Sequence, residues 1–209
     1  MDAVRTNLGP VRSDVENEAD VLRHPLRDRR IWRLSLGSAP LIFTQVVVTG
    51  FVVLFLESQR DFSHAQAGAV LAGMNVIGGA GRLLGGRLSD RLGSRIGLVR
   101  RIALATALVV ACAAGLVDVS GWLLVPALVL GGGLSMSWNG LAVTAAVELA
   151  GARRSGAALG LQQTLIGAAA VVTPLVFAPL VAATSWRAGL VAAAACPLLG
   201  LGVLRGLGR

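Results

Sequence analysis

The chain has 209 residues, of which 55% are hydrophobic and only 14% are charged, whereas a soluble domain carries about 25% charged residues. This composition excludes a large soluble core and is typical of a polytopic membrane protein. The net charge of +8 comes from 19 basic residues that are all arginine, and a chain without lysine cannot hydrolyse ATP through a phosphate-binding P-loop.

The first 30 residues form a polar segment with charges of both signs. Residues 1–33 contain seven of the 19 arginines and six of the 11 acidic residues. We interpret residues 1–30 as a cytoplasmic tail or linker. No signal peptide is expected, because the first apolar run begins only near Leu34 and is too long for the apolar region of a signal peptide.

Six apolar runs follow and make residues 31–209 a transmembrane domain. A helix needs about 20 apolar residues to cross the hydrocarbon core of a bilayer, and each run is long enough. The expected fold is therefore all-α, with six transmembrane helices. Their approximate limits are 34–56, 65–86, 98–117, 121–147, 156–182 and 187–205.

Glycines within these runs predict close helix packing. Gly81 with Gly85, and Gly156 with Gly160, form GxxxG patterns, which let two helix backbones approach each other in a bilayer. The consecutive glycines 131–133 are able to loosen the fourth helix locally.

The placement of arginine predicts the orientation. Cytoplasmic segments of membrane proteins carry an excess of basic residues. With the N-terminus inside, only Arg60 and Arg187 would lie outside. We therefore expect a multi-pass protein of the plasma (inner) membrane with both termini cytoplasmic. The same rule explains the basic net charge, so no nucleic-acid partner is expected. The inner arginines are the N-terminal cluster and Arg87, Arg91, Arg95, Arg100, Arg101, Arg153, Arg154, Arg205 and Arg209.

A short charged loop between the second and third runs reads GGRLSDRLGSRIG. Gly86 and Gly93 permit a tight turn and close helix packing. Asp90 is an acid among several arginines, so it can accept hydrogen bonds from a helix N-terminus or pair with Arg91 or Arg95. The alternative is a solvated, positively charged loop without a specific role.

This loop resembles the cytoplasmic signature loop of the major facilitator superfamily, roughly G-x-L-x-D-R-x-G-R-R. Ser94 replaces the first of the two paired basic residues. Three later segments are similar to the end of the tenth helix, the start of the eleventh and the entry to the twelfth in bacterial members: WNGLAVTAAVELAG from Trp138, RRSGAALGLQQT from Arg153 and WRAGL from Trp186. The matching loop residues are Gly86, Leu88, Asp90, Arg91, Gly93 and Arg95.

The resemblance implies the C-terminal half of a twelve-helix bundle, whose halves are related by an axis along the membrane normal. In the family, the aspartate of the loop contacts a helix start in the opposite half and helps to hold the inner gate shut. The resemblance therefore assigns gating to Gly86, Asp90, Arg91, Gly93 and Arg95. It also implies a second six-helix half, from another chain or a second copy of this one.

Polar residues inside the spans are candidates for binding a solute, because uncompensated polar groups are costly in a bilayer. We predict that Gln45, Asn75, Asn139 and Gln163 face a substrate cavity; the alternative is hydrogen bonding between helices. Arg82 lies close enough to the inner interface for its side chain to reach it.

Charges near the ends of the spans suggest one more element of the gate. Glu148 ends the fourth span and is followed by Arg153 and Arg154, a spacing that suggests an ion pair at the inner gate.

No cofactor, metal site or enzymatic constellation is expected. His24 and His64 lie outside the spans without metal-ligand spacing, and Cys112 and Cys196 lie inside apolar runs. The favoured function is secondary active transport of a small organic solute by alternating access, as a half-length or truncated transporter in the lipid bilayer. The alternatives are a non-transporting remnant or scaffold, or a homodimeric six-helix carrier.

Overall fold

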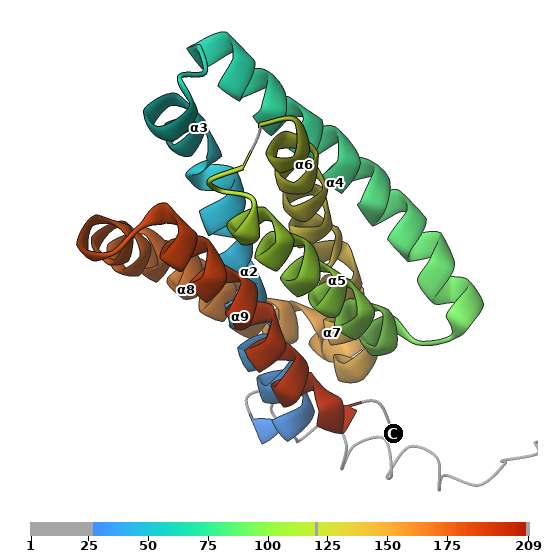
Figure 1. Ribbon diagram of the computed structural model, residues 1–209. Helices are drawn as coiled ribbons and strands as arrows, with labels where there is room; N and C mark the ends of the chain where they lie inside the picture. Colours follow the sequence, from blue (N-terminus) through green and yellow to red (C-terminus); the bar gives the residue numbers. More distant parts are fainter. Residues whose placement is uncertain (1–26, 120, 208–209) are drawn as a thin grey trace, which may run out of the picture.

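The computed structural model describes residues 27–119 and 121–207 (Figure 1), so most of the predicted N-terminal tail lies outside the described residues. All secondary structure in the described part is helical. The elements are α2 (Arg29–Gly50), α3 (Val52–Arg60), α4 (His64–Leu92), α5 (Arg95–Gly115), α6 (Gly121–Ser137), α7 (Asn139–Ala150), η2 (Ala152–Arg154), α8 (Ser155–Ala183), α9 (Trp186–Leu204) and η3 (Arg205–Leu207).

Six helical stretches in the described part are long and apolar enough to cross a membrane, as the sequence predicts. Two of the predicted spans are interrupted. The first is divided into α2 and α3 at Phe51, and the fourth is divided into α6 and α7 at Trp138. The first span also begins earlier than expected, at Arg29, because the Asp28 side chain accepts a hydrogen bond from the Arg30 amide (2.8 Å) and caps the helix.

The helices form one bundle around α2, α5 and α6. Figure 1 shows α4 on one side of the bundle and α8 with α9 on the other. The closest pairings are α4 with α6, α5 with α9, and α2 with α8 and α9. This arrangement leaves α4 and α8 as the two flanking helices.

Most buried apolar side chains of the described residues form two clusters. One cluster surrounds Trp138, Leu34 and Leu204. The other surrounds Phe55, Phe177 and Leu190, with Trp186 packed against it. Ring contacts join Phe51 to Phe177 (4.8 Å between centroids) and Phe55 to Trp186 (5.2 Å), so aromatic packing holds α3, α8 and α9 together.

Glycines bring α4 and α6 into backbone contact. A Cβ added at Gly133 would lie 2.7 Å from the Ile77 Cβ and 3.3 Å from the Gly78 nitrogen. The three consecutive glycines therefore serve close packing, and the interruption of this span lies beyond them at Trp138. Of the two GxxxG patterns, Gly81 and Gly85 pack against α6 and α7, whereas Gly156 and Gly160 meet nothing within 4 Å.

We predict that Gly133→Ala destabilises the bundle by about 1–3 kcal/mol, because the added methyl group overpacks the contact with α4. The matched control is Gly202→Ala in α9, where an added Cβ meets nothing within 4 Å. Thermal unfolding of both variants in detergent measures the difference. Equal melting temperatures would show that α4 and α6 do not pack as closely as described.

Candidate functional site

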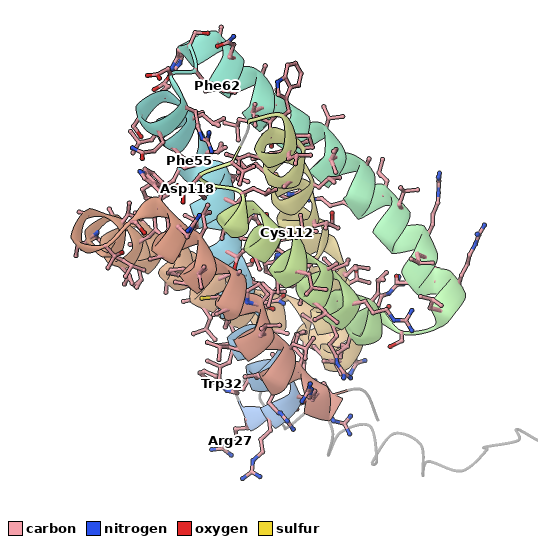
Figure 2. All side chains as sticks on the ribbon, in the orientation of Figure 1. Arg27, Trp32, Phe55, Phe62, Cys112 and Asp118 are labelled. Carbon is pink, nitrogen blue, oxygen red and sulfur yellow. The ribbon has the colours of Figure 1, made fainter. Side chains whose placement is uncertain are left out.

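The two ends of the bundle carry different chemistry. We call one the Arg-rich end; there α4 ends, α5 begins and α7 and α9 end. The other, called the opposite end, carries α3, the start of α4 and the turn between α8 and α9. Figure 2 shows Phe55, Phe62 and Asp118 at the opposite end, far from Arg27 and Trp32. The described arginines of the Arg-rich end include Arg87, Arg91, Arg95, Arg100, Arg101, Arg153, Arg154 and Arg205.

The turn between α4 and α5 is as tight as the sequence predicts. Gly93 ends α4 with φ +62°, a left-handed conformation that favours glycine. The Ser94 Oγ then accepts a hydrogen bond from the Gly97 amide (3.1 Å) and caps α5. Gly86 was also expected in this turn, but it lies inside α4, where an added Cβ meets nothing within 4 Å.

Arg95 joins three helices at the Arg-rich end. Its Nη1 lies 2.6 Å from Asp90 Oδ1 of α4, and its Nε donates to Glu148 Oε1 of α7 (3.1 Å). Nη1 also contacts the Ser89 hydroxyl. Of the two partners considered for Asp90, the structure thus selects Arg95; Arg91 is exposed. These groups line a pocket of about 210 Å³, together with Gly93 and Ser94.

Glu148 does not meet the arginines that the sequence suggested. Within the described residues its ion pair is to Arg95 of α5 (3.1 Å), not to Arg153 or Arg154. The reason is the turn after α7: Gly151 has φ +72°, so η2 follows in a new direction. The sequence could not show this pairing, because Arg95 and Glu148 are 53 residues apart.

The four amide side chains predicted to face a cavity lie on four different helices. Asn75 of α4 and Gln163 of α8 are exposed, whereas Gln45 of α2 and Asn139 of α7 are half-buried. No hydrogen bond joins any two of them in the described part of the chain. The Asn75 Nδ2 donates to the Leu71 carbonyl of its own helix (2.8 Å), and the Gln45 Oε1 is buried without a hydrogen-bond partner.

Two polar residues have roles that sequence reasoning missed. Gln162 is fully buried and its Nε2 donates to the Ala142 carbonyl (3.2 Å), so it holds α8 against α7. Arg82 donates from Nε to the Met136 carbonyl (3.0 Å), two residues before the interruption at Trp138. An arginine within an apolar run was the available signal for the second role.

Side chains also hold the opposite end together. Arg60 donates to the carbonyls of Val119 (2.7 Å) and Leu116 (3.3 Å) and contacts that of Val117, all at the end of α5. Arg187 of α9 pairs with Asp118. In residues 27–119 and 121–207, no group of three or more His, Cys, Asp or Glu side chains could hold a metal ion.

We predict that Arg95→Gln loosens the Arg-rich end, because one substitution breaks the ion pairs to both Asp90 and Glu148. Amide hydrogen exchange should become faster around residues 89–98 and 145–151 and stay unchanged at the opposite end. Arg91→Gln is the matched control, since Arg91 makes no ion pair within the described residues. Similar exchange in both variants would exclude a special role for Arg95.

Comparison with known proteins agrees with this architecture. Residues 4–174 match the family model of the Major Facilitator Superfamily. An uncharacterized MFS-type transporter of Mycobacterium tuberculosis strain H37Rv is 33% identical over 207 residues, which cover 94% of this chain and 46% of the relative. A second, from strain CDC 1551 / Oshkosh, is 32% identical with the same coverage.

Among solved structures, a variant of the E. coli fucose:proton symporter FucP has a similar fold. The TM-score is 0.74 at 15% identity, over 99% of this chain and 48% of the symporter. The chain thus spans about half the length of the relatives it matches. The family model covers most of the chain, and the six spans and the α4–α5 loop agree with it; the chain belongs to the Major Facilitator Superfamily and is a multi-pass membrane protein.

Proposed function

We propose that the chain is one six-helix half of a secondary active transporter that moves a small organic solute across the membrane by alternating access. The observation that carries this proposal is the incomplete burial of the two flanking helices. In their most apolar stretches, only 22% of α4 and 17% of α8 is buried, compared with 56% of α2. Two long helices therefore have faces that the described residues do not cover.

The uncovered faces of α4 and α8 carry small and polar residues that suit contact with another helix, in addition to apolar residues that suit lipid. α4 carries glycines at positions 68, 79 and 86 where an added Cβ meets nothing within 4 Å, and α8 carries such glycines at positions 156, 160 and 167. Open glycines on a transmembrane helix favour close approach of another helix. Asn75 and Gln163 are exposed on the same two helices, and exposed amides in hydrocarbon are costly.

A second six-helix half is the partner that fits these faces best. The relatives are about twice as long as this chain, and a domain of the same fold would cover both flanking helices. The second half could come from another chain or from a second copy, since halves related by an axis along the membrane normal can associate in parallel. Lipid alone would leave the Gln163 amide and the Asn75 side-chain oxygen without hydrogen-bond partners.

The ion-pair cluster at the Arg-rich end supports a gate. Asp90 keeps 64% of its side chain exposed while it contacts Arg95, so it remains accessible to a helix start of the second half. A helix N-terminus attracts a carboxylate. An ionic contact of this kind can form in one state of a transport cycle and break in the other, as alternating access requires.

We predict that the Arg-rich end is cytoplasmic. In a variant without its two native cysteines, Cys112→Ser with Cys196→Ser, a cysteine introduced at Ser94 should be labelled only in opened cells. A cysteine at Ser63, at the start of α4, should be labelled in intact cells by a reagent that cannot cross the membrane. Labelling of position 94 in intact cells would reverse the orientation.

We predict that the chain purified alone is an oligomer or poorly stable, and that it does not catalyse uptake in proteoliposomes. The physical reason is the unpaired polar groups on α4 and α8. Size measurement in mild detergent and uptake assays check this expectation. A stable monomer with solute flux would instead favour an independent six-helix carrier, and a complete assembly without flux for any solute would favour a non-transporting scaffold.

In an assembly that transports, Asp90→Asn should lower the uptake rate by at least about tenfold. The substitution weakens the contact of the Asp90 carboxylate in the closed gate, and a loss of about 1.4 kcal/mol in that contact changes the equilibrium between closed and open gate tenfold. Membrane insertion should be unchanged. Ser94→Ala, in the adjacent turn, controls for local disturbance. Uptake by Asp90→Asn at the rate of the unsubstituted protein would remove Asp90 from the gate.

A further inference from the structure

We propose that the transported solute carries an oxyanion, such as a carboxylate or a phosphate, and that Arg82 binds it. This inference rests on the proposed transport function, because it names the class of solute that the transporter would move. It begins from the position of Arg82, a charged residue of α4 that lies inside the predicted span and is exposed in the described chain.

Arg82 lies within the predicted span 65–86, four residues before its end. At 1.5 Å per residue, this places it roughly 6 Å along the helix axis from the end of the span. Its side chain turns toward α6, where Nε donates to the Met136 carbonyl (3.0 Å). This anchored position differs from an arginine that simply extends along the helix to the membrane surface.

The charge of Arg82 has no counter-ion in the described part of the chain. The ion pairs of the described residues join other groups: Arg95 with Asp90 and Glu148, Arg187 with Asp118, and His64 with Glu57. A guanidinium stays protonated in proteins, and an unpaired charge inside a membrane is costly and is usually functional. An anionic ligand would neutralise it.

The geometry of the side chain favours an oxyanion over a simple anion. Because Nε is used by Met136, the two terminal nitrogens Nη1 and Nη2 remain available, and no hydrogen bond from them is formed within the described residues. These two donors form the fork that binds two oxygens of a carboxylate or phosphate side by side.

Asn75 extends the same surface. It lies seven residues before Arg82 on α4, so the two side chains share a face of the helix and lie roughly 10 Å apart along its axis. Asn75 is also exposed, and its Nδ2 is held by the Leu71 carbonyl, which leaves its oxygen free to accept a hydrogen bond. A solute with an oxyanion at one end and a hydrogen-bond donor at the other would fit this pair.

The other charges of the described chain agree with an anion rather than a cation. Its carboxylates lie near the ends of the bundle: Glu57, Asp61 and Asp118 at the opposite end, and Asp28, Asp90 and Glu148 at the Arg-rich end. Between these two groups of carboxylates, the described spans offer the charge of Arg82 and amide side chains but no carboxylate. A cation would have no counter-charge there, whereas an oxyanion would have one.

Protection from chemical modification tests this inference at the residue itself. The full chain is placed in nanodiscs of phosphatidylcholine and treated with phenylglyoxal, which reacts with guanidinium groups, and modification of each arginine is measured by mass spectrometry. The probes are benzoate, succinate and inorganic phosphate as anions, glucose as a neutral solute and choline as a cation. Arg87 is the internal control, because it lies on the same helix and is exposed.

We expect at least one anion to slow modification of Arg82 by about tenfold or more, as expected for two charge-assisted hydrogen bonds, while Arg87 changes little. Glucose and choline should have no such effect. The inference is overturned if no anion protects Arg82 more than Arg87, or if glucose or choline protects it equally. Protection only when phosphatidylglycerol is added to the nanodiscs would assign the site to a lipid headgroup instead.

Two variants separate ligand binding from a purely structural role at Met136. Succinate and phosphate should raise the melting temperature of the unsubstituted chain and of Arg87→Gln, but not of Arg82→Gln. Arg82→Lys should keep part of the shift, because it retains the charge but loses the fork. If Arg82→Gln retains the full anion-dependent shift, Arg82 is only a packing residue. Anion protection without uptake of any solute by a complete assembly would instead refute transport and leave the anion site in place.

Discussion

The hydrocarbon core of a membrane offers no hydrogen-bond partners, so polar groups of the spans must find their partners within the protein. Within each helix, the backbone amides and carbonyls satisfy this constraint by bonding to one another. Near a helix interruption or a close helix contact, side chains from other helices bond to backbone carbonyls. Arg82 bonds to Met136 beside the interruption at Trp138, Gln162 bonds to Ala142, and Thr44 bonds to Ala193 (2.7 Å). Polar side chains that bond to carbonyls of neighbouring helices therefore help to define how the helices fit together.

Arginines connect the helices at three depths of the bundle. Arg60 holds carbonyls at the end of α5, Arg82 holds a carbonyl of α6, and Arg95 bridges carboxylates on α4 and α7. The three differ in what surrounds them. Arg95 is neutralised by two acids and suits an ionic gate, whereas Arg82 has no acid in the described chain and suits an external anion. The same residue type thus supports different roles because its counter-charges differ.

Local rules predicted the parts of the site that depend on neighbours in sequence. The turn at Gly93 was predicted in this way, and the ion-pair partner of Asp90 was narrowed to Arg91 or Arg95, because these residues are at most five positions apart. The structure then selected Arg95. Pairing over long separations could not be predicted in this way. Glu148 meets Arg95, not Arg153 or Arg154, and Gln162 is buried while the adjacent Gln163 is exposed. Both outcomes depend on which helix faces each side chain. Neighbouring residues of similar polarity look alike in the sequence, so the sequence does not indicate which of them meets another helix.

The sequence by itself determined the number of spans, their approximate limits and the family, because apolar length and the charged loop motif are properties of consecutive residues. Tertiary structure alone decided where the spans are interrupted and what the glycines contact. Gly81 and Gly85 pack against α6 and α7, whereas the same pattern at Gly156 and Gly160 stays open. The difference arises because a small residue permits close approach without specifying a partner, and only the packed bundle supplies one.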